Sequence, residues 1–169
     1  MTRLTELPVL LRIWGVVFFA NIMGAALLAF LLSNTGIFNT DSAMAALRFG
    51  EHAAELPWWD LFWKAVMAGW LVASMVWLVH AARDMTGRFI IVYVLMFMIP
   101  SADLFHCIIA SCEMAYVVFE GAVSWLDYGH VLSAVTIGNT VGGVVLVAIL
   151  NFAQVPSRRL PEGNKKQVE

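Results

Sequence analysis

Three ionisable side chains, Asp103, His106 and Glu113, lie within one apolar region of the chain. On a continuous helix, a step of 100° per residue would place them at about +60°, 0° and −20°, on one face. Ionisable groups in an apolar membrane segment are expected to face inward and to mark a path for protons or ions. His106 is the main candidate, because the pKa of a histidine is near neutral and modest surroundings decide its charge.

The two acids suggest supporting roles on that face. Asp103 is expected to set the tautomer of His106 and to favour its charged form, and Glu113 is a candidate second relay point. The alternative is that Asp103 and His106 cap a break in the helix, while Glu113 lies near the outer membrane interface and is solvated.

The composition of the whole chain indicates a membrane protein. Of its 169 residues, 61% are hydrophobic and 13% are charged, and the net charge is −2. Soluble domains carry roughly 25% charged residues. The charge balance offers no basis for nucleic-acid binding. The sequence therefore predicts an all-α integral membrane protein that contacts the lipid bilayer.

The apolar stretches are long enough for four transmembrane helices, since about 20 residues cross a hydrocarbon core of roughly 30 Å. A cytoplasmic segment of residues 1–12 precedes a transmembrane domain of residues 13–155, and a cytoplasmic tail of residues 156–169 follows it. The predicted spans are residues 13–32, 61–82, 89–119 and 131–153.

The third predicted span is too long for one straight helix, and we expect it to be broken near residues 100–106, close to mid-membrane. Pro100 removes a backbone donor and clashes with the preceding turn. Such a break persists in lipid only where it faces protein or a watery cavity. Polar residues follow the proline at once, which marks this place as the predicted site.

Basic residues predict the orientation. Basic residues precede the first span, separate the second from the third and follow the fourth: Arg3, Arg12, Arg83, Arg88, Arg158, Arg159, Lys165 and Lys166. Of the other two connections, one has only Arg48 and Lys64, and the one around Glu120 and Asp127 has none. By the positive-inside rule both termini are expected to be cytoplasmic.

A short motif occurs in both the first and the fourth span. Ala20-Asn21-Ile22-Met23-Gly24 and Gly138-Asn139-Thr140-Val141-Gly142 share a small residue, an asparagine, two other residues and a glycine. Small residues four apart let helices approach closely. The motif also fits a transporter repeat, in which corresponding helices of two halves carry similar signatures. Packing is favoured for Asn21 and Gly24, whereas Asn139, with Thr136, Gly138 and Gly142, could also lie beside a pore.

A metal site is the weaker interpretation of the region around His106. Cys107, Cys112 and Glu113 could join the histidine as ligands, but no second ligand cluster lies on another span, and zinc requires four ligands in defined geometry. We expect no metal and no cofactor. Because no nucleophile is paired with a base, an enzyme is also disfavoured.

Taken together, these segments resemble the formate/nitrite transporter family over residues 8–155. The first span, VVFFANIMGAALLAFLL, is similar to that family's third helix, and WKAVMAGWLVASMVWLVHAARD to its fourth. His106 stands at the histidine of the motif in the broken fifth helix. The last span, VTIGNTVGGVVLV, resembles the glycine-rich sixth helix.

The resemblance implies a six-helix, aquaporin-like fold of two inverted halves, so the family's first two helices are expected to be missing before Met1. The chain also departs from the family pattern. Phe105 replaces the expected glutamate, Ala110 an asparagine and Gly69 another asparagine. These differences suggest a divergent subgroup.

The resemblance further implies transport of a small monovalent anion, such as formate, nitrite or hydrosulfide, together with a proton. It implies a homo-oligomer, a pentamer by family analogy, in a bacterial-type cytoplasmic (inner) membrane. The alternative is a structural or regulatory membrane subunit without its own pore.

Overall fold

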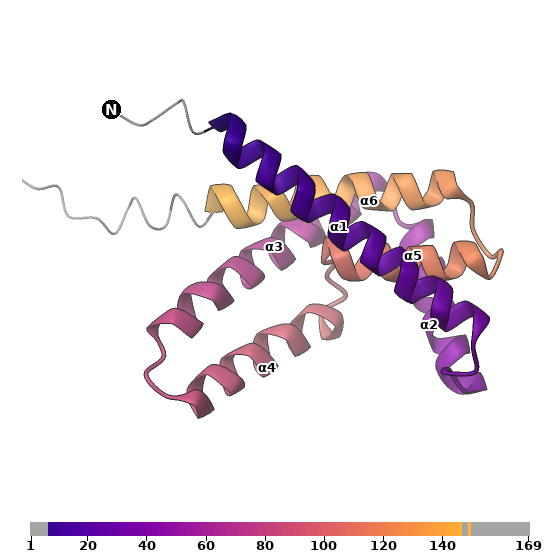
Figure 1. Cartoon of the computed structure of the whole chain (residues 1–169), viewed down its shortest axis with the longest axis horizontal. Helices are drawn as coiled ribbons and strands as arrows, with labels where there is room; N and C mark the ends of the chain where they lie inside the picture. The colour runs from indigo at the N-terminus through magenta and orange to yellow at the C-terminus, as the bar shows by residue number, and fades with distance from the viewer. Residues whose placement is uncertain (1–6, 147–148, 150–169) are drawn as a thin grey trace, which may run out of the picture.

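The computed structural model describes residues 7–146 and 149, and all regular secondary structure in them is helical (Figure 1). In order, the elements are α1 (Leu7–Asn34), α2 (Thr40–Glu55), α3 (Trp58–Ala81), α4 (Met85–Ser101), α5 (Cys107–Phe119), α6 (Trp125–Thr140) and the π-helix η2 (Val141–Leu146). The described residues thus form six α-helices and one π-helix, and the prediction of four membrane crossings stays a prediction. The end of the fourth predicted span and the tail, residues 156–169, lie outside the described residues.

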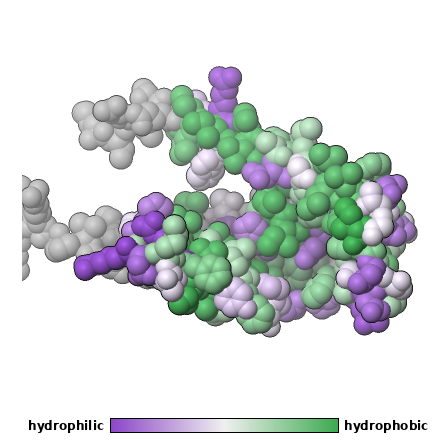
Figure 2. All heavy atoms as spheres, turned by 60° about the horizontal axis from the view of Figure 1, so that its bottom comes forward, coloured by the Kyte–Doolittle hydropathy of each residue, from purple (hydrophilic) through white to green (hydrophobic). Residues whose placement is uncertain are grey.

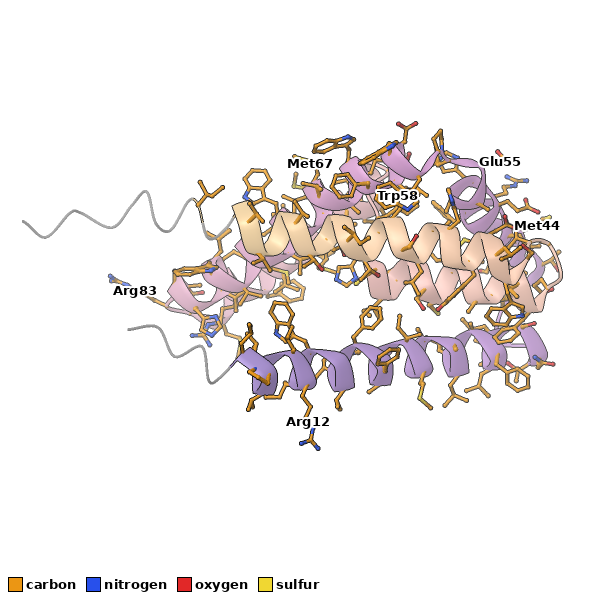
Figure 3. All side chains as sticks on the ribbon, turned by 90° about the horizontal axis from the view of Figure 1, so that it is seen from above. Arg12, Met44, Glu55, Trp58, Met67 and Arg83 are labelled. Carbon is orange, nitrogen blue, oxygen red and sulfur yellow. The ribbon has the colours of Figure 1, made fainter. Side chains whose placement is uncertain are left out.

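Helix α1 is apolar on nearly all sides. Only Ala25 and Ala29 are buried, and the helix packs mainly against α5. Figure 3 shows it along one side of the molecule, with Arg12 pointing away from the other helices. A helix that exposes apolar side chains all round is suited to lipid or to further helices rather than to water. By length and composition, α1 and α3 can each cross a membrane.

Helix α2 lies between the first two predicted spans, in a stretch for which no helix was predicted. Asn39 is its N-cap and accepts a hydrogen bond from the Ser42 N–H at 2.9 Å, and Asp41 lies in the first turn. Both features stabilise a helix start. The helix lays Gly50 and Ala53 against the protein, and Gly50 contacts Val117 of α5. It was missed because its composition is too polar for a span.

Helices α4 and α5 are separated by a turn, so the predicted region 89–119 consists of two helices. The Leu104 N–H bonds to the Ile99 carbonyl at 2.9 Å, and the Asp103 N–H to the Pro100 carbonyl at 3.2 Å. This pair of bonds is a Schellman motif, which requires a left-handed residue after the helix. Asp103 is that residue, with a φ of 52°.

Helix α3 packs closely against α6 and η2. A Cβ on Gly138 would approach the Ala65 Cβ to 2.7 Å, and one on Gly142 would approach the Trp70 N to 2.9 Å. These glycines therefore let the two backbones come together. After Gly138 the α-helix continues into η2, and α4 projects beside α3 as a hairpin (Figure 1).

The buried core lies where α3, α5 and α6 meet, with α1 and α2 covering α5. Its largest fully buried side chains are Leu61, Met114, Val117, Val131 and Val135. Apolar side chains also cover much of the face seen in Figure 2. A small buried core and a largely apolar surface are typical of a protein whose surface contacts lipid or other helices rather than water.

Candidate functional site

The turn between α4 and α5 presents His106. This residue is the N-cap of α5 in extended conformation, but its side chain makes no capping hydrogen bond. Instead the imidazole lines a cavity of about 200 Å³. Its Nδ1 is buried and has no hydrogen-bond partner among the described residues. An unpaired buried nitrogen is rare in proteins, so this ring is available to a proton or a ligand.

Asn139 of α6 holds the backbone on both sides of His106. Its Oδ1 accepts from the Cys107 N–H at 2.9 Å, and its Nδ2 donates to the Phe105 carbonyl at 2.9 Å. The same Nδ2 donates to the Ala65 carbonyl of α3 at 2.8 Å. One amide therefore ties α3, α6 and the start of α5 together at the turn. A single side chain can do this because an amide offers two donors and one strong acceptor.

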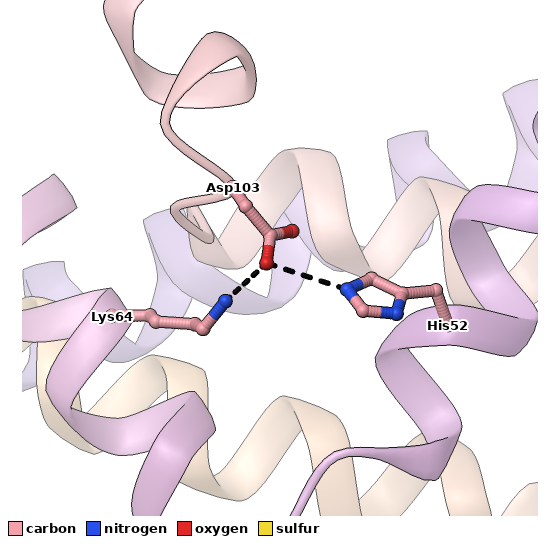
Figure 4. Close-up of polar contacts among 3 residues, drawn as sticks. All are labelled: His52, Lys64 and Asp103. Carbon is pink, nitrogen blue, oxygen red and sulfur yellow. Dashed lines mark hydrogen bonds and ion pairs between the residues drawn. The ribbon is translucent and has the colours of Figure 1, made fainter.

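Asp103 contacts a lysine and a histidine from two other helices (Figure 4). Its Oδ2 accepts a hydrogen bond from Lys64 of α3, and it lies 3.3 Å from Nε2 of His52 in α2. The structure does not show the expected contact between Asp103 and His106, and Asp103 contacts Lys64 and His52 instead. The two residues also lie in the turn rather than on one continuous helix, so the geometry behind the predicted common stripe is wrong.

Asp103, His106 and Glu113 nevertheless line the same cavity, together with His52 and apolar side chains. Glu113 is half-buried on α5 and also reaches a wider groove of about 730 Å³ between α1, α2 and α5. It makes no hydrogen bond or ion pair with another described side chain. The three predicted ionisable residues are thus close in space, for reasons different from a shared helix face.

The remaining predicted residues lie either along the wide groove or on the segment formed by α6 and η2. Asn21 and Gly24 line the wide groove, where the Asn21 amide bonds to its own helix at the Val17 carbonyl and nothing lies within 4 Å of a Cβ on Gly24. By contrast Gly138 and Gly142 contact α3. Thr136 has a buried hydroxyl without a partner among the described residues.

Lys64 and His52 were missed as site residues. Their partner is 39 residues away for Lys64 and 51 for His52. No periodicity reveals such a contact. The positive charge within an apolar helix was the one available signal.

Cys107 and Cys112 are free thiols. Among the described residues, no group of three His, Cys, Asp or Glu side chains is arranged to hold a metal ion.

Comparison with known proteins places this geometry in a family. The family model described as formate/nitrite transporter matches residues 1–153. The match does not support the finer expectations of missing helices and of a divergent subgroup.

Individual relatives agree with that match. Inner membrane protein YfdC of Escherichia coli (strain K12) is 29% identical over 98% of this chain and 52% of its own length. A probable formate transporter of Methanothermobacter thermautotrophicus is 29% identical over 83% of this chain and 58% of its own length. The chain thus spans little more than half the length of these curated relatives.

A solved structure shares the fold. A pentameric formate channel with formate bound superimposes with a TM-score of 0.72 and 25% identity, covering 90% of this chain and 68% of that one. From the family match over almost its whole length, the chain belongs to the formate/nitrite transporter family.

Proposed function

We propose that this chain takes part in moving a small monovalent anion, of the formate, nitrite or hydrosulfide type, across a bacterial inner membrane together with a proton. His106 is the titratable group on the path, and Glu113 is a second relay point. The chain acts in a homo-oligomer. Support for the anion and the assembly comes from the relatives, which include a probable formate transporter and a pentameric formate channel.

The observation that carries the proposal is the unpaired, buried Nδ1 of His106 beside a small cavity. A bare anion at the centre of a bilayer is costly, so a path needs a group that lends it a proton or neutralises its charge. An imidazole can do either near neutral pH. Apolar neighbours in the cavity, Ile99, Leu104 and Ile109, lower the local polarity around the ring and so strengthen the interaction.

The remaining proposed site residues act around this ring. Asn139 orients the backbone that carries His106, and Thr136, Gly138 and Gly142 support α6 next to it. Asn21 and Gly24 line the wide groove and are pore-adjacent in this proposal. One consequence is that substituting His106 should change how transport responds to pH more than it changes folding.

The test is His106→Asn in liposomes that contain the purified chain. Asparagine keeps a hydrogen-bonding side chain of moderate size and removes the titration, so the pH dependence of anion uptake should flatten. His80→Asn is the matched control, because among the described residues His80 bonds only to the Val76 carbonyl of its own helix. If His106→Asn moved formate or nitrite with the parent's pH profile, His106 would be a structural residue at the turn. A parent chain that moved neither anion would favour the structural subunit.

A further inference from the structure

The turn that carries His106 contains an unusual residue at its tightest point. Position 103 is the left-handed residue of the Schellman motif, with φ at 52°. Glycine adopts this conformation without cost, and asparagine and aspartate tolerate it best among the other residues. The end of helix α4 therefore does not require a carboxylate at this position. The carboxylate at this position must be explained by what it binds.

Its two partners come from different helices. Lys64 of α3 and His52 of α2 both face the same oxygen, Oδ2 of Asp103 (Figure 4). Because α4 itself packs mainly against α3, these contacts join the end of α4 to α2 as well. The residues Lys64, Asp103 and His52 are called the Asp103 cluster below.

Lys64 also contacts the next part of the turn. Its ammonium group lies 5.9 Å from the centre of the Phe105 ring, which is buried. A cation at this distance over a ring is attracted by the π electrons. Lys64 thus holds the segment at Asp103 and at Phe105, the residue directly before His106.

Asn139 fixes the other side of the same segment, through the Phe105 carbonyl and the Cys107 N–H. Backbone contacts therefore surround His106, while its own Nδ1 has no partner among the described residues. This arrangement fixes the position of the residue and leaves its ring free for chemistry.

We infer that Lys64, Asp103 and His52 are positioning residues, which fix the α4–α5 turn and so determine how His106 faces the cavity. The inference rests on the proposed function and assigns Asp103 a role that acts through the backbone rather than by relaying a proton. Glu113 and His106 are the other titratable groups that line the cavity. Within four positions of Lys64 or His52 along their own helices, the charged residues are Asp60 on α3 and Arg48, Glu51 and Glu55 on α2.

The test separates charge from backbone conformation. Asp103→Asn keeps a side chain that tolerates the left-handed conformation and removes the carboxylate. Lys64→Met removes the charge at similar length, and Lys64→Arg retains it. The first readout is the rate at which N-ethylmaleimide modifies Cys107 in micelles, in a Cys112→Ser background, because Cys107 begins α5 next to His106.

Asp103→Asn and Lys64→Met are expected to speed the modification of Cys107 about two- to fivefold, the range for an ion pair this exposed. Lys64→Arg should restore the parental rate. The matched control is Cys112 in a Cys107→Ser background, whose rate should not change. Unchanged Cys107 rates, or equal increases at both cysteines, would overturn the inference, since the latter indicates general unfolding.

The second readout is the pH profile of formate uptake by liposomes containing the same variants. Asp103→Asn and Lys64→Met should shift or flatten the profile, and Lys64→Arg should preserve it. Altered Cys107 rates with a parental profile would overturn the link to His106. If the parent shows no uptake, the proposed function fails, whereas the Cys107 rates still decide whether the cluster fixes the turn.

Discussion

Replacing Asn139 with alanine tests whether one amide holds the turn. The substitution leaves the Cys107 N–H and the Phe105 carbonyl without partners, because neither makes another hydrogen bond among the described residues. The Ala65 carbonyl, which lies inside α3, keeps its helical partner.

The expected loss follows from those two groups. An orphaned buried polar group costs about 1–3 kcal/mol, so Asn139→Ala should cost about 2–6 kcal/mol. For a chain of this length that corresponds to a fall in Tm of at least about 5 °C. Asn139→Asp should be as harmful or worse, since it turns a carboxylate oxygen toward two carbonyl oxygens.

The measurement is thermal unfolding in detergent, followed by tryptophan fluorescence and by size-exclusion chromatography of heated samples. Asn21→Ala is the control, because the Asn21 amide is exposed and, in the part of the chain that the structure describes, bonds only within α1. It occupies the same position in the repeated motif and should change Tm by less than about 2 °C. Equal melting of Asn139→Ala and Asn21→Ala would refute the assignment of Asn139 as the residue that holds the turn.

Three further expectations can be checked together. Gly142→Ala should lower Tm, because the added Cβ would meet the α3 backbone. Gly24→Ala should be neutral or stabilising, since a Cβ there meets nothing within 4 Å. Thermal unfolding of both variants in parallel checks this difference. Tyr128→Phe should lower the free energy of unfolding by about 1–2 kcal/mol, because it removes the 2.8 Å hydrogen bond to the buried Ser111. Adding Ser111→Ala should recover part of that loss, and a double-mutant cycle measures the recovery. Reporter fusions should place the C-terminus in the cytoplasm and the connection near Ser124 outside, and a periplasmic C-terminus would contradict the predicted orientation.

Hydropathy is the main sequence signal for long helices here, because length and apolar composition decide which segments can cross a bilayer. The predicted spans 13–32 and 61–82 lie almost wholly within α1 and α3. Pro100 and the polar residues after it marked the turn, because proline cannot continue a hydrogen-bonded helix undisturbed. Helix α2 was not predicted, because hydropathy does not detect an amphipathic helix. Asn39 and Asp41 are nevertheless residues typical of a helix N-terminus.

The site was less accessible to sequence reasoning. His106, Asp103 and Glu113 stood out as ionisable residues in an apolar region, and they do line one cavity. The assumption of a continuous helix gave them the wrong relation to one another. Partners such as Lys64 for Asp103, or Ala65 for Asn139, depend on how distant helices pack, which local periodicity does not encode.

The central claim is that anion and proton move together through a path that depends on His106. The most direct measurement is the internal pH of liposomes containing the chain and a trapped pH-sensitive dye, recorded after formate is added outside with an inward proton gradient. Protein-free liposomes set the background rate for diffusion of formic acid. The account predicts protein-dependent acidification above that background, reduced to near background by His106→Asn and retained in His80→Asn. Acidification by the His106→Asn variant at the parent's rate would contradict it.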